Sequence, residues 1–332
     1  MGSEIQSRQS EELIREMTKR AFGDQKIREI VELTEGSFNV AYRIIFEDGT
    51  EAILKIAPED KSRQIACEVN LMEAETQAMK LAREKAHVPA PKLFYFDQSC
   101  SLCKSDYFFM ERMPGGSFHS VEEQLSEEQK DVIRHEIGEL LHKLHQVKGT
   151  KFGLLGDTEH QFDTMFEYLY YYVDALLVNS EVAQIDLTVP YDLIREKLQE
   201  EKDIFTEVTE PALVFWDSWN GNVFVKDGHV TGLIDWERAC WSESFMEDRF
   251  RTHSYDAAFY EGYGVARCIE EVTSSSQRIL TANERRRMFW YDVYLYIIMM
   301  TEWAPIYRNY PDDSQYQWIS GVFSEVWAKN MK

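Results

Sequence analysis

The chain of 332 residues is long enough for two lobes around a cleft, and its 44% hydrophobic content supports a substantial core. Asp and Glu outnumber Lys and Arg by 58 to 36, which gives a formal net charge of −22 at pH 7. This balance argues against nucleic acids and anionic membranes as partners, because both need basic surfaces. It suits a cationic substrate, which an acidic cleft would concentrate.

Cysteine usage and the lack of targeting signals indicate a cytoplasmic protein. The five cysteines are scattered and odd in number, which is not a disulfide framework. Cys100 and Cys103 form a single CxxC without a second ligand pair, so we interpret them as part of a loop. No signal peptide is evident at the start, and the apolar run at 295–300 is too short to span a membrane.

The first hundred residues predict a small sheet with one helix upon it. Residues 3–21 have helical spacing of apolar side chains, and three strands follow between 31 and 56, joined by two glycine-containing turns. The first turn contains Gly36 and Ser37 and leads to Asn39. A glycine turn between strands lets backbone amides approach phosphate oxygens.

The third predicted strand carries a lysine among apolar residues. Leu54 and Ile56 point to one face of the strand, so Lys55 points to the other. Residues 64–86 have helical spacing and offer several carboxylates that could pair with this ammonium group. The candidates are Glu68, Glu73 and Glu75.

A hinge between two lobes is predicted near residue 114. Prolines at 89 and 91 end the helix, and two aromatic strands follow at 92–96 and 107–110. The change from strand to Glu111-Arg-Met-Pro-Gly-Gly is typical of a lobe boundary. We therefore expect an N-terminal lobe at 1–113 and a C-terminal lobe at 114–332.

The second lobe is predicted to be larger and mainly helical. Ser126 caps a helix that runs to about residue 146, and helical patterns recur at 162–205, 256–268 and 281–303, with a closing helix near the end. The aromatic run at 166–173 favours core packing, with a substrate wall as the alternative. We interpret His142 and His145, three residues apart, as packing residues rather than metal ligands. The expected fold class is α+β.

Three polar side chains follow one another at strand edges in the stretch 213–237. Asp217 follows a short apolar run, Asn222 opens the next one, and Asp235 ends a strand that follows the Asp227-Gly228 hairpin turn. Phosphoryl transfer needs such a set, because one carboxylate must orient a hydroxyl and accept its proton. An amide oxygen and a second carboxylate can hold Mg²⁺. The alternative is a hairpin with ordinary polar turn residues.

The stretch resembles the aminoglycoside phosphotransferase family, which shares the two-lobed protein-kinase-like fold with choline kinases. Asp217-x-x-x-x-Asn222 and Ile234-Asp-Trp are similar to the family motifs His-Gly-Asp-Leu-x-x-x-Asn and Ile-Asp-Trp. The chain departs from the family at Phe215-Trp216, where the family has His-Gly. In the family that His usually holds the loop in place, so its replacement here bears on the geometry of the loop.

The resemblance implies an ATP- and Mg²⁺-dependent kinase acting on a small-molecule hydroxyl. Asp217 would be the catalytic base, and Asn222 and Asp235 would bind the metal. Glu75, in a segment similar to the family's, would pair with Lys55, with Glu73 as the second choice. The nucleotide would contact a set of residues from the first lobe and the hinge: Gly36, Ser37, Asn39, Lys55, Glu75, Glu111 and Met113.

The acceptor is left open by the motifs. An aminoglycoside-like cation suits the acidic residues that follow the Ile-Asp-Trp motif, and these are candidate substrate contacts: Glu237, Glu243, Glu247 and Asp248. Macrolides, choline, homoserine or sugars are alternatives, and the tyrosines at 168–172 could line an apolar wall for a macrolide. A nucleotide-binding regulator with weak catalysis is a further alternative. A protein kinase is disfavoured, since no activation segment ending in Ala-Pro-Glu follows Asp235.

Overall fold

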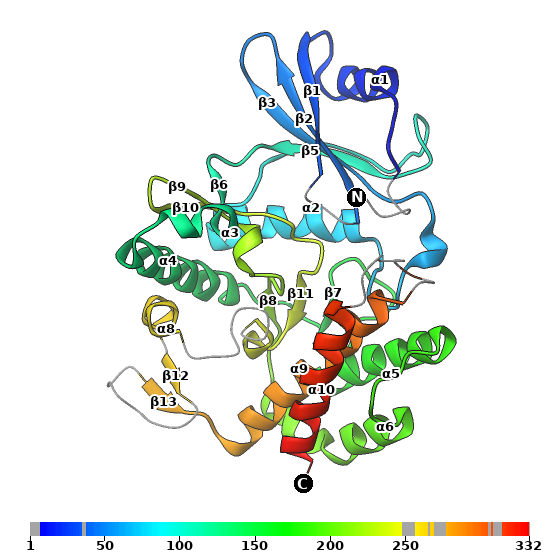
Figure 1. The fold of residues 1–332 in the computed structure, drawn as a ribbon, viewed down its shortest axis with the longest axis vertical. Helices are drawn as coiled ribbons and strands as arrows, with labels where there is room; N and C mark the ends of the chain where they lie inside the picture. Colours follow the sequence, from blue (N-terminus) through cyan, green and yellow to red (C-terminus); the bar gives the residue numbers. More distant parts are fainter. Residues whose placement is uncertain are drawn as a thin grey trace.

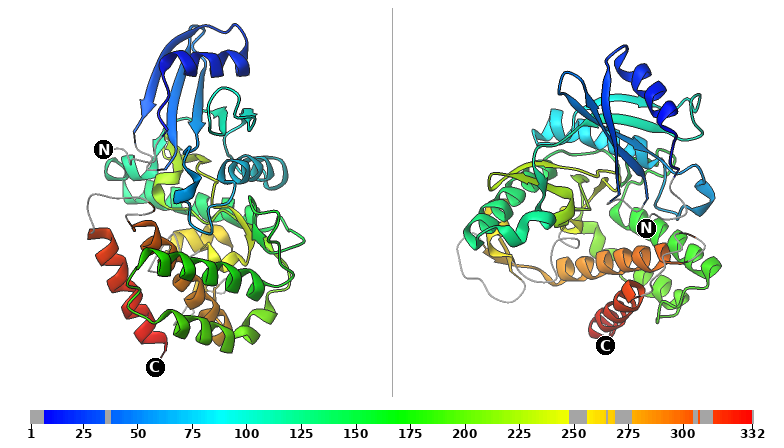
Figure 2. Two further views of the ribbon diagram at one scale, coloured as in Figure 1. Left: turned by 90° about the vertical axis from the view of Figure 1, so that its right-hand side faces the viewer. Right: turned by 45° about the horizontal axis from the view of Figure 1, so that its top comes forward.

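The computed structural model describes residues 7–34, 38–247, 256–264, 266–268, 277–304, 307 and 314–331. A sheet with two helices forms the upper part of the molecule, and helices dominate the lower part (Figure 1). The two parts keep this arrangement in the further views of Figure 2. The α+β class and the two-lobed arrangement predicted from the sequence are therefore confirmed.

The N-terminal sheet has five antiparallel strands in the order β1-β2-β3-β5-β4. They are β1 (Ile27–Leu33), β2 (Val40–Phe46), β3 (Glu51–Ile56), β4 (Leu93–Asp97) and β5 (Tyr107–Glu111). Alternate residues of β3 enter different cores: Leu54 and Ile56 pack with helix α1 (Glu11–Phe22), and Ile53 packs with helix α2 (Leu71–Leu81). Lys55 shares the face of Ile53, so it points toward α2.

Helix α2 begins later than the sequence pattern suggested. A short turn, η1 (Lys61–Arg63), precedes residues 64–70, which are not helical, and the regular helix starts after Asn70, which has φ +45°. The carboxylate of Glu68 accepts a hydrogen bond from the backbone N–H of Ile65, which stabilises an irregular turn there. The helix then continues into a π-helical turn, η2 (Ala82–Ala86).

Two small sheets form the upper surface of the C-terminal lobe. Strands β10 (His229–Leu233), β9 (Val223–Lys226) and β6 (Gly116–Ser117) form one, and β7 (Gly153–Leu154), β11 (Cys240–Ser242) and β8 (Ala212–Val214) form the other. The predicted hairpin at Asp227-Gly228 joins β9 to β10. Between β8 and β9 lies the loop that carries Asp217, with the short turn η5 (Asn220–Asn222) at its end. The lobe boundary at 113/114 stays a prediction.

Helices build the rest of the lobe around α9 (Ala282–Glu302), most of whose side chains are buried. The other helical elements are α3 (Phe118–Val121), η3 (Glu122–Gln124), α4 (Glu127–His145), α5 (Met165–Ala183), α6 (Tyr191–Glu200), η4 (Lys202–Glu207), η6 (Ser244–Met246), α8 (Ala257–Tyr263) and α10 (Ser314–Asn330). Of these, α5, α10, η4 and η6 contact α9, whereas α4 packs against α8 and α3 packs near β6 and β9.

The predicted helix at 256–268 is shorter in the structure. It ends at Tyr263, where Gly264 adopts φ +79°, and Ala266–Cys268 then forms strand β12, parallel to β13 (Gln277–Ile279). Among the described residues, none of the helices combines the length and apolarity needed to cross a bilayer.

Candidate active site

Lys55 is the centre of a charge cluster that joins the two lobes. Its Nζ donates to Glu75 Oε2 at 2.6 Å, to Asp235 Oδ1 at 2.6 Å and to Glu237 Oε2 at 3.2 Å. Glu75 comes from α2, while the other two carboxylates follow β10 in the second lobe. The lysine and its helical partner were chosen from the sequence, and the structure places their side chains together. Glu73 lies on the same helix without such a contact being observed.

The electrostatics of the cluster keep Lys55 charged. Burial alone would lower the pKa of Lys55, but the surrounding carboxylates raise it well above its usual value. Burial raises the pKa of Glu75, and the ammonium group at 2.6 Å opposes that rise. Three carboxylates surround one ammonium group. The acidic groups of the cluster therefore outnumber the basic one, which favours the binding of a further cation.

Glu237 also reaches the glycine turn of the first lobe. Asn39 Nδ2 donates to Glu237 Oε2 at 2.8 Å, close to the point where the same oxygen accepts from Lys55. The predicted phosphate-binding residues Gly36 and Ser37 lie outside the described residues. The contact of Asn39 nevertheless puts the end of that turn directly above the segment that follows Asp235.

Local hydrogen bonds hold the loop that carries Asp217 to Asn222, and Asn222 to Ile234, the residue before Asp235. Asn222 Nδ2 donates to the backbone carbonyl of Asp217 at 3.0 Å, and the carbonyl of Asn222 accepts from Ile234 N at 2.9 Å. Asp235 follows immediately with φ +64°, a left-handed conformation that is strained for a residue with a side chain. The three polar side chains singled out in the sequence therefore come from adjoining segments.

Asp217 lies in an environment that favours its protonated form. Burial of the carboxyl raises its pKa to about 8, with the carboxylates of Asp235 and Glu237 adding to the effect. The guanidinium of Arg238 is a nearby positive charge that opposes this rise. A carboxyl with a raised pKa in a cleft has the properties expected of a general base.

The oxygen donors at this site fit Mg²⁺. Because Asn222 uses Nδ2 for the Asp217 carbonyl, its side-chain oxygen is the atom left for a cation, and Asp235 has a second carboxylate oxygen besides the one that contacts Lys55. Carboxylate oxygens of Glu75, Asp235 and Glu237 lie within 4.8 Å of one another, although Lys55 already occupies the centre of that group. Hard oxygen ligands of this kind are those that Mg²⁺ prefers.

The residues before Asp217 explain how the loop holds its shape without the family's His-Gly. Trp216 has φ +56°, a conformation that costs about 1–3 kcal/mol for a non-glycine residue. Its indole stacks on Tyr294 of α9 with the ring centroids 5.0 Å apart and the planes 2° from parallel. Phe215 packs against Trp236 at 4.4 Å. Both residues are buried, so core packing offsets the backbone strain.

Glu247 supplies the polar part of this support. Its carboxylate accepts hydrogen bonds from the backbone N–H groups of Phe215 at 2.8 Å and of Trp216 at 3.1 Å. The side chain is fully buried, and His145 Nε2 lies 3.6 Å from it. On its other side, His145 Nδ1 is 2.7 Å from the hydroxyl of Tyr263 on α8. A chain of polar contacts therefore connects α8 and α4 to the loop that carries Asp217.

We predict that Glu247→Gln weakens this support. The amide keeps one acceptor oxygen but loses the charge, and hydrogen bonds to a charged group contribute about 1.5–3 kcal/mol. The free energy of unfolding, measured by urea titration, should fall by that amount, and turnover should fall with it as the loop loses its geometry. Glu261→Gln, on the exposed side of α8, is the matched control and should change neither. A stable but inactive E247Q variant would assign Glu247 a role in chemistry instead.

The acidic residues expected to contact a cationic acceptor are mostly engaged elsewhere. Glu247 has no exposed surface, which does not fit the expected substrate contact. Glu243 pairs with Arg287 Nε at 3.0 Å and accepts from the hydroxyl of Tyr291 at 2.5 Å. Glu237 is shared by Lys55 and Asn39. Asp248 lies outside the described residues.

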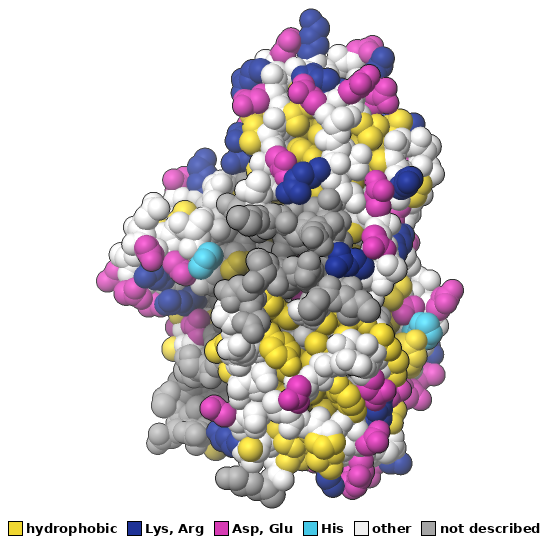
Figure 3. Space-filling view, turned by 45° about the vertical axis from the view of Figure 1, so that its right-hand side comes forward, with side chains coloured by type: hydrophobic (Ala, Val, Ile, Leu, Met, Phe, Trp, Pro, Cys, Tyr) yellow, Lys and Arg dark blue, Asp and Glu magenta, His cyan; other side chains and the backbone are white. Residues whose placement is uncertain are grey.

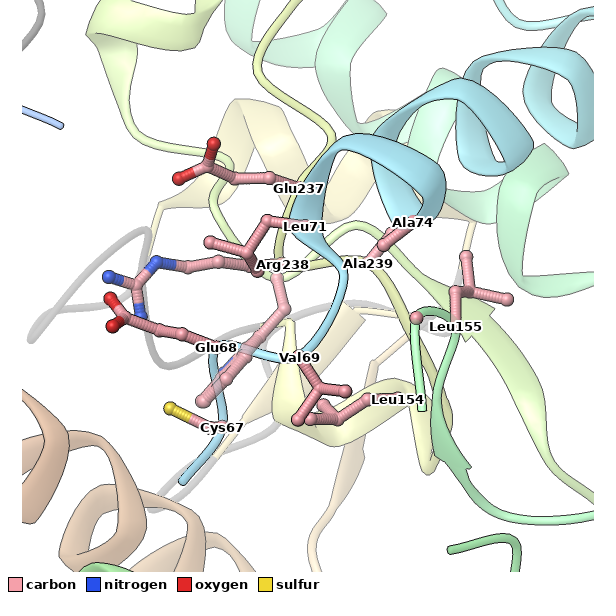
Figure 4. A pocket seen from close by; sticks show the side chains of 12 residues that line it. Cys67, Glu68, Val69, Leu71, Ala74, Leu154, Leu155, Glu237, Arg238 and Ala239 are labelled. Atoms are coloured by element: carbon pink, nitrogen blue, oxygen red, sulfur yellow. The ribbon is translucent and has the colours of Figure 1, made fainter. Parts of the chain in front are cut away.

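Arg238 is a residue of this region that the sequence gave no reason to select. It pairs with Glu302 at the end of α9, more than sixty residues away along the chain. Figure 4 shows the side chains of Arg238, Glu237 and Glu68 directed to the same side of their segments. They line a small pocket between the start of α2 and the residues after Asp235. Only the fold brings Glu302 here, so no local pattern could have indicated it.

The two residues predicted to bind the nucleotide base, Glu111 and Met113, lie at the end of β5 and just beyond it. Glu111 ends β5, where its N–H donates to the carbonyl of Lys92 and its carboxylate accepts from Lys92 N. Met113 is buried against Gly232 of β10, and a Cβ added to that glycine would lie 2.2 Å from Met113 Cε. Only glycine leaves room for the methionine there. This contact joins the hinge to strand β10 of the C-terminal lobe.

The aromatic run of α5 belongs to the core. Tyr168 and Tyr172 are buried, and the hydroxyl of Tyr172 donates to Asp157 at 2.7 Å. Tyr171 stacks on His160 with centroids 4.6 Å apart. Tyr168 and Tyr172 therefore have no surface for an apolar acceptor, whereas Tyr170 and Tyr171 of the same run are only partly buried.

The comparison with protein families agrees with this geometry. The chain belongs to the phosphotransferase enzyme family, whose sequence model matches residues 29–272. This match includes Lys55, Glu75, Asp217, Asn222 and Asp235. A comparison with curated protein sequences found no match.

Solved structures of kinases share the fold. A candidate fructosamine-3-kinase from Thermobifida fusca is 15% identical, with a TM-score of 0.64 over 94% of this chain and 98% of the other. A thermostable mutant of the aminoglycoside phosphotransferase APH(4)-Ia is also 15% identical, with a TM-score of 0.59 over 96% and 99%. An aminoglycoside phosphotransferase homologue from Ralstonia eutropha is 12% identical, with a TM-score of 0.62 over 97% and 99%. The protein-kinase-like fold is thus established.

Proposed function

We propose that the protein is an ATP- and Mg²⁺-dependent kinase that transfers the γ-phosphate to a hydroxyl of a cationic small molecule. The observation that carries the proposal is the Lys55 cluster, in which one ammonium group is held by Glu75 and Asp235 beside the loop of Asp217. Family membership supports phosphoryl transfer as the reaction. An ATP-dependent reaction would fit the expected cytoplasmic location, as does the absence of a disulfide at Cys67, Cys100, Cys103 and Cys240 among the described residues.

The nucleotide is proposed to bind between the lobes. Backbone groups of Glu111 and Met113 would hold the base, and Gly36, Ser37 and Asn39 would approach the phosphates from the glycine turn. Lys55 would exchange part of its contact with Asp235 and Glu237 for phosphate oxygens while Glu75 keeps it in place. Solved structures of the fold include a complex of APH(4)-Ia with AMP-PNP and hygromycin B, and a complex of APH(2'')-IIa with ATP and streptomycin.

In the proposed chemical step, Asp217 accepts the proton of the acceptor hydroxyl. Its carboxylate would orient the acceptor hydroxyl, whose oxygen bonds to the γ-phosphorus as the bond from that phosphorus to the β-bridging oxygen breaks. The hydroxyl proton passes to Asp217, and ADP leaves. Asn222 and Asp235 would hold Mg²⁺, which when bound supplies positive charge for the phosphate oxygens. Positioning and charge neutralisation account for most of the acceleration in such reactions.

We predict that the rate of acceptor phosphorylation rises with pH. Because the pKa of Asp217 is raised to about 8, its base form increases as the pH rises toward that value. Any cation bound beside Asp235 favours the ionised carboxyl, so the midpoint should lie at or below about 8. Arg238→Gln removes a positive charge that lowers this pKa and should move the midpoint upward. A rate that declines between pH 6 and 8 would contradict the assignment of Asp217 as base.

The regulator alternative depended on the unusual Phe215-Trp216 pair. In the structure both side chains of this pair are buried, and the carboxylate of Glu247 accepts hydrogen bonds from both backbone N–H groups. These contacts hold the loop where the family has His-Gly. That packing favours an active loop over a degraded one.

The function is tested by measuring Mg²⁺-dependent ATP turnover with a panel of hydroxylated amines, sugars and macrolides. Stimulation of ADP release by an amine-bearing acceptor, together with a phosphorylated product in mass spectrometry, is the expected result. ATP binding without turnover of any acceptor would favour the regulator. Failure to bind Mg²⁺-nucleotide at all would refute both.

A further inference from the structure

Recognition of a cationic acceptor requires groups that the protein has not already used. The carboxylates of Glu237, Glu243 and Glu247 are bound by other parts of the chain. On the face drawn in Figure 3, acidic and basic side chains alternate over both lobes, so negative charge is spread over that face. An acceptor with several ammonium groups would need several free carboxylates near Asp217. The structure instead offers an aromatic face.

Trp219 is an exposed tryptophan in the catalytic loop itself. It lies two residues after Asp217 and three before Asn222, and 45% of its surface is accessible. Two residues of extended chain span at most about 7 Å, so a small molecule with its hydroxyl at Asp217 has its body within reach of the indole. Core packing accounts for the neighbouring Trp216 and Trp236 but not for this side chain.

The indole of Trp219 is held in place although it is exposed. It lies against Gly221, where an added Cβ would be 2.1 Å from the ring, and the ring of His119 is 5.7 Å away. The Trp219 carbonyl accepts from Asn222 N at 3.0 Å. Asn220 Nδ2 donates to Glu122 Oε2 at 2.9 Å, which ties the loop to η3. A fixed aromatic face loses little entropy when a ligand stacks on it.

We propose that the face of Trp219 binds an ammonium group of the acceptor. The acceptor is then a small amino alcohol or amino sugar with one charged amine near the reacting hydroxyl, rather than a polyamine. This inference rests on the proposed function and narrows its substrate class. Ammonium groups are attracted to the face of an indole, and Trp is the aromatic side chain that binds them best. The carboxylate of Glu122, which accepts from Asn220 and lies 3.5 Å from His119 Nδ1, adds negative charge to this part of the loop.

The test compares charged and uncharged acceptors in matched variants. Glucosamine and ethanolamine are assayed beside their N-acetyl derivatives, which lack the charge, and beside hygromycin B and streptomycin. The variants are Trp219→Leu, which removes the aromatic face, and Trp219→Phe, which keeps a weaker one. Trp318→Leu, on the exposed side of α10, is the control. KM and kcat are measured separately, and glucosamine binding to the protein with Mg²⁺ and AMP-PNP is measured by calorimetry.

We expect Trp219→Leu to raise KM and Kd for the charged compounds by about threefold to thirtyfold, with kcat changed less than threefold. Trp219→Phe should be intermediate, and Trp318→Leu should match the wild type. Equal effects on charged and N-acetylated compounds, or a fall in kcat alone, would overturn the role of Trp219. A wild-type preference for hygromycin B or streptomycin would overturn the single-amine class.

Failure of this inference is distinguishable from failure of the proposed function. Turnover of any acceptor that is insensitive to Trp219→Leu leaves the kinase function standing and removes only the tryptophan assignment. A wild-type protein that does not bind Mg²⁺ and AMP-PNP removes the kinase function itself, and the inference with it.

Discussion

Replacement of Asp217 by Asn is expected to lower kcat by about 10²–10⁴-fold while leaving nucleotide affinity nearly unchanged. The amide cannot accept the proton of the acceptor hydroxyl, and general-base catalysis contributes about this factor. Asp217 makes its observed contact with Asn222 through its backbone carbonyl, so the change leaves that hydrogen bond in place. Steady-state turnover gives kcat, and calorimetry with Mg²⁺ and AMP-PNP gives the nucleotide affinity.

Asp227→Asn is the matched control for this variant. It makes the same chemical change ten residues later, at the tip of the β9–β10 hairpin, where asparagine tolerates the observed φ of +53°. Turnover should be unaffected there. Should D217N retain more than a tenth of wild-type kcat on a confirmed acceptor, Asp217 is not the base, and the buried carboxyl has a structural role.

Replacement of Lys55 by Met is expected to lower the free energy of unfolding by about 3–5 kcal/mol. The change removes the one ammonium group from three carboxylates, and the loss of one partner from a buried ion pair costs this amount because the other charge is left uncompensated. The same variant should bind Mg²⁺-nucleotide poorly, since its phosphate contact is gone. Urea titration and calorimetry measure the two effects.

A double variant separates the buried charge from the lysine's packing. Lys55→Met combined with Glu75→Gln should recover part of the lost stability, because the most buried carboxylate is then neutral. Lys226→Met on β9, which is exposed, should leave stability within about 0.5 kcal/mol of the wild type. If the double variant is less stable than Lys55→Met alone, Glu75 is not held by charge pairing.

Much of the fold was accessible from local patterns. Alternation along β3 put Lys55 on a different face from Leu54 and Ile56, and the Asp227-Gly228 turn predicted the β9–β10 hairpin. The start of α2 was wrong by seven residues because the apolar spacing continues through 64–70. There the Glu68 side chain binds the backbone and favours a turn.

The support of the site depends on contacts between distant parts of the chain. Glu247 was selected as an acidic residue near the motif, but its function as an acceptor for the loop amides follows only from folding. Glu302 lies sixty-four residues beyond Arg238, and His145 contacts Tyr263 across 118 positions. Spacing rules describe neighbours along one element, so they cannot predict such pairs. Trp219 was visible in the motif, but its exposure was not.

The left-handed backbone at Trp216 restricts how this loop can be exchanged between homologues. A loop with glycine at this position carries its conformation by itself, whereas here Tyr294 of α9 must be present to receive the indole. Grafting the segment 213–222 into a relative that lacks a matching helix would transfer the motif without its anchorage. In a redesign, α9 and the loop at 213–222 should therefore be changed together.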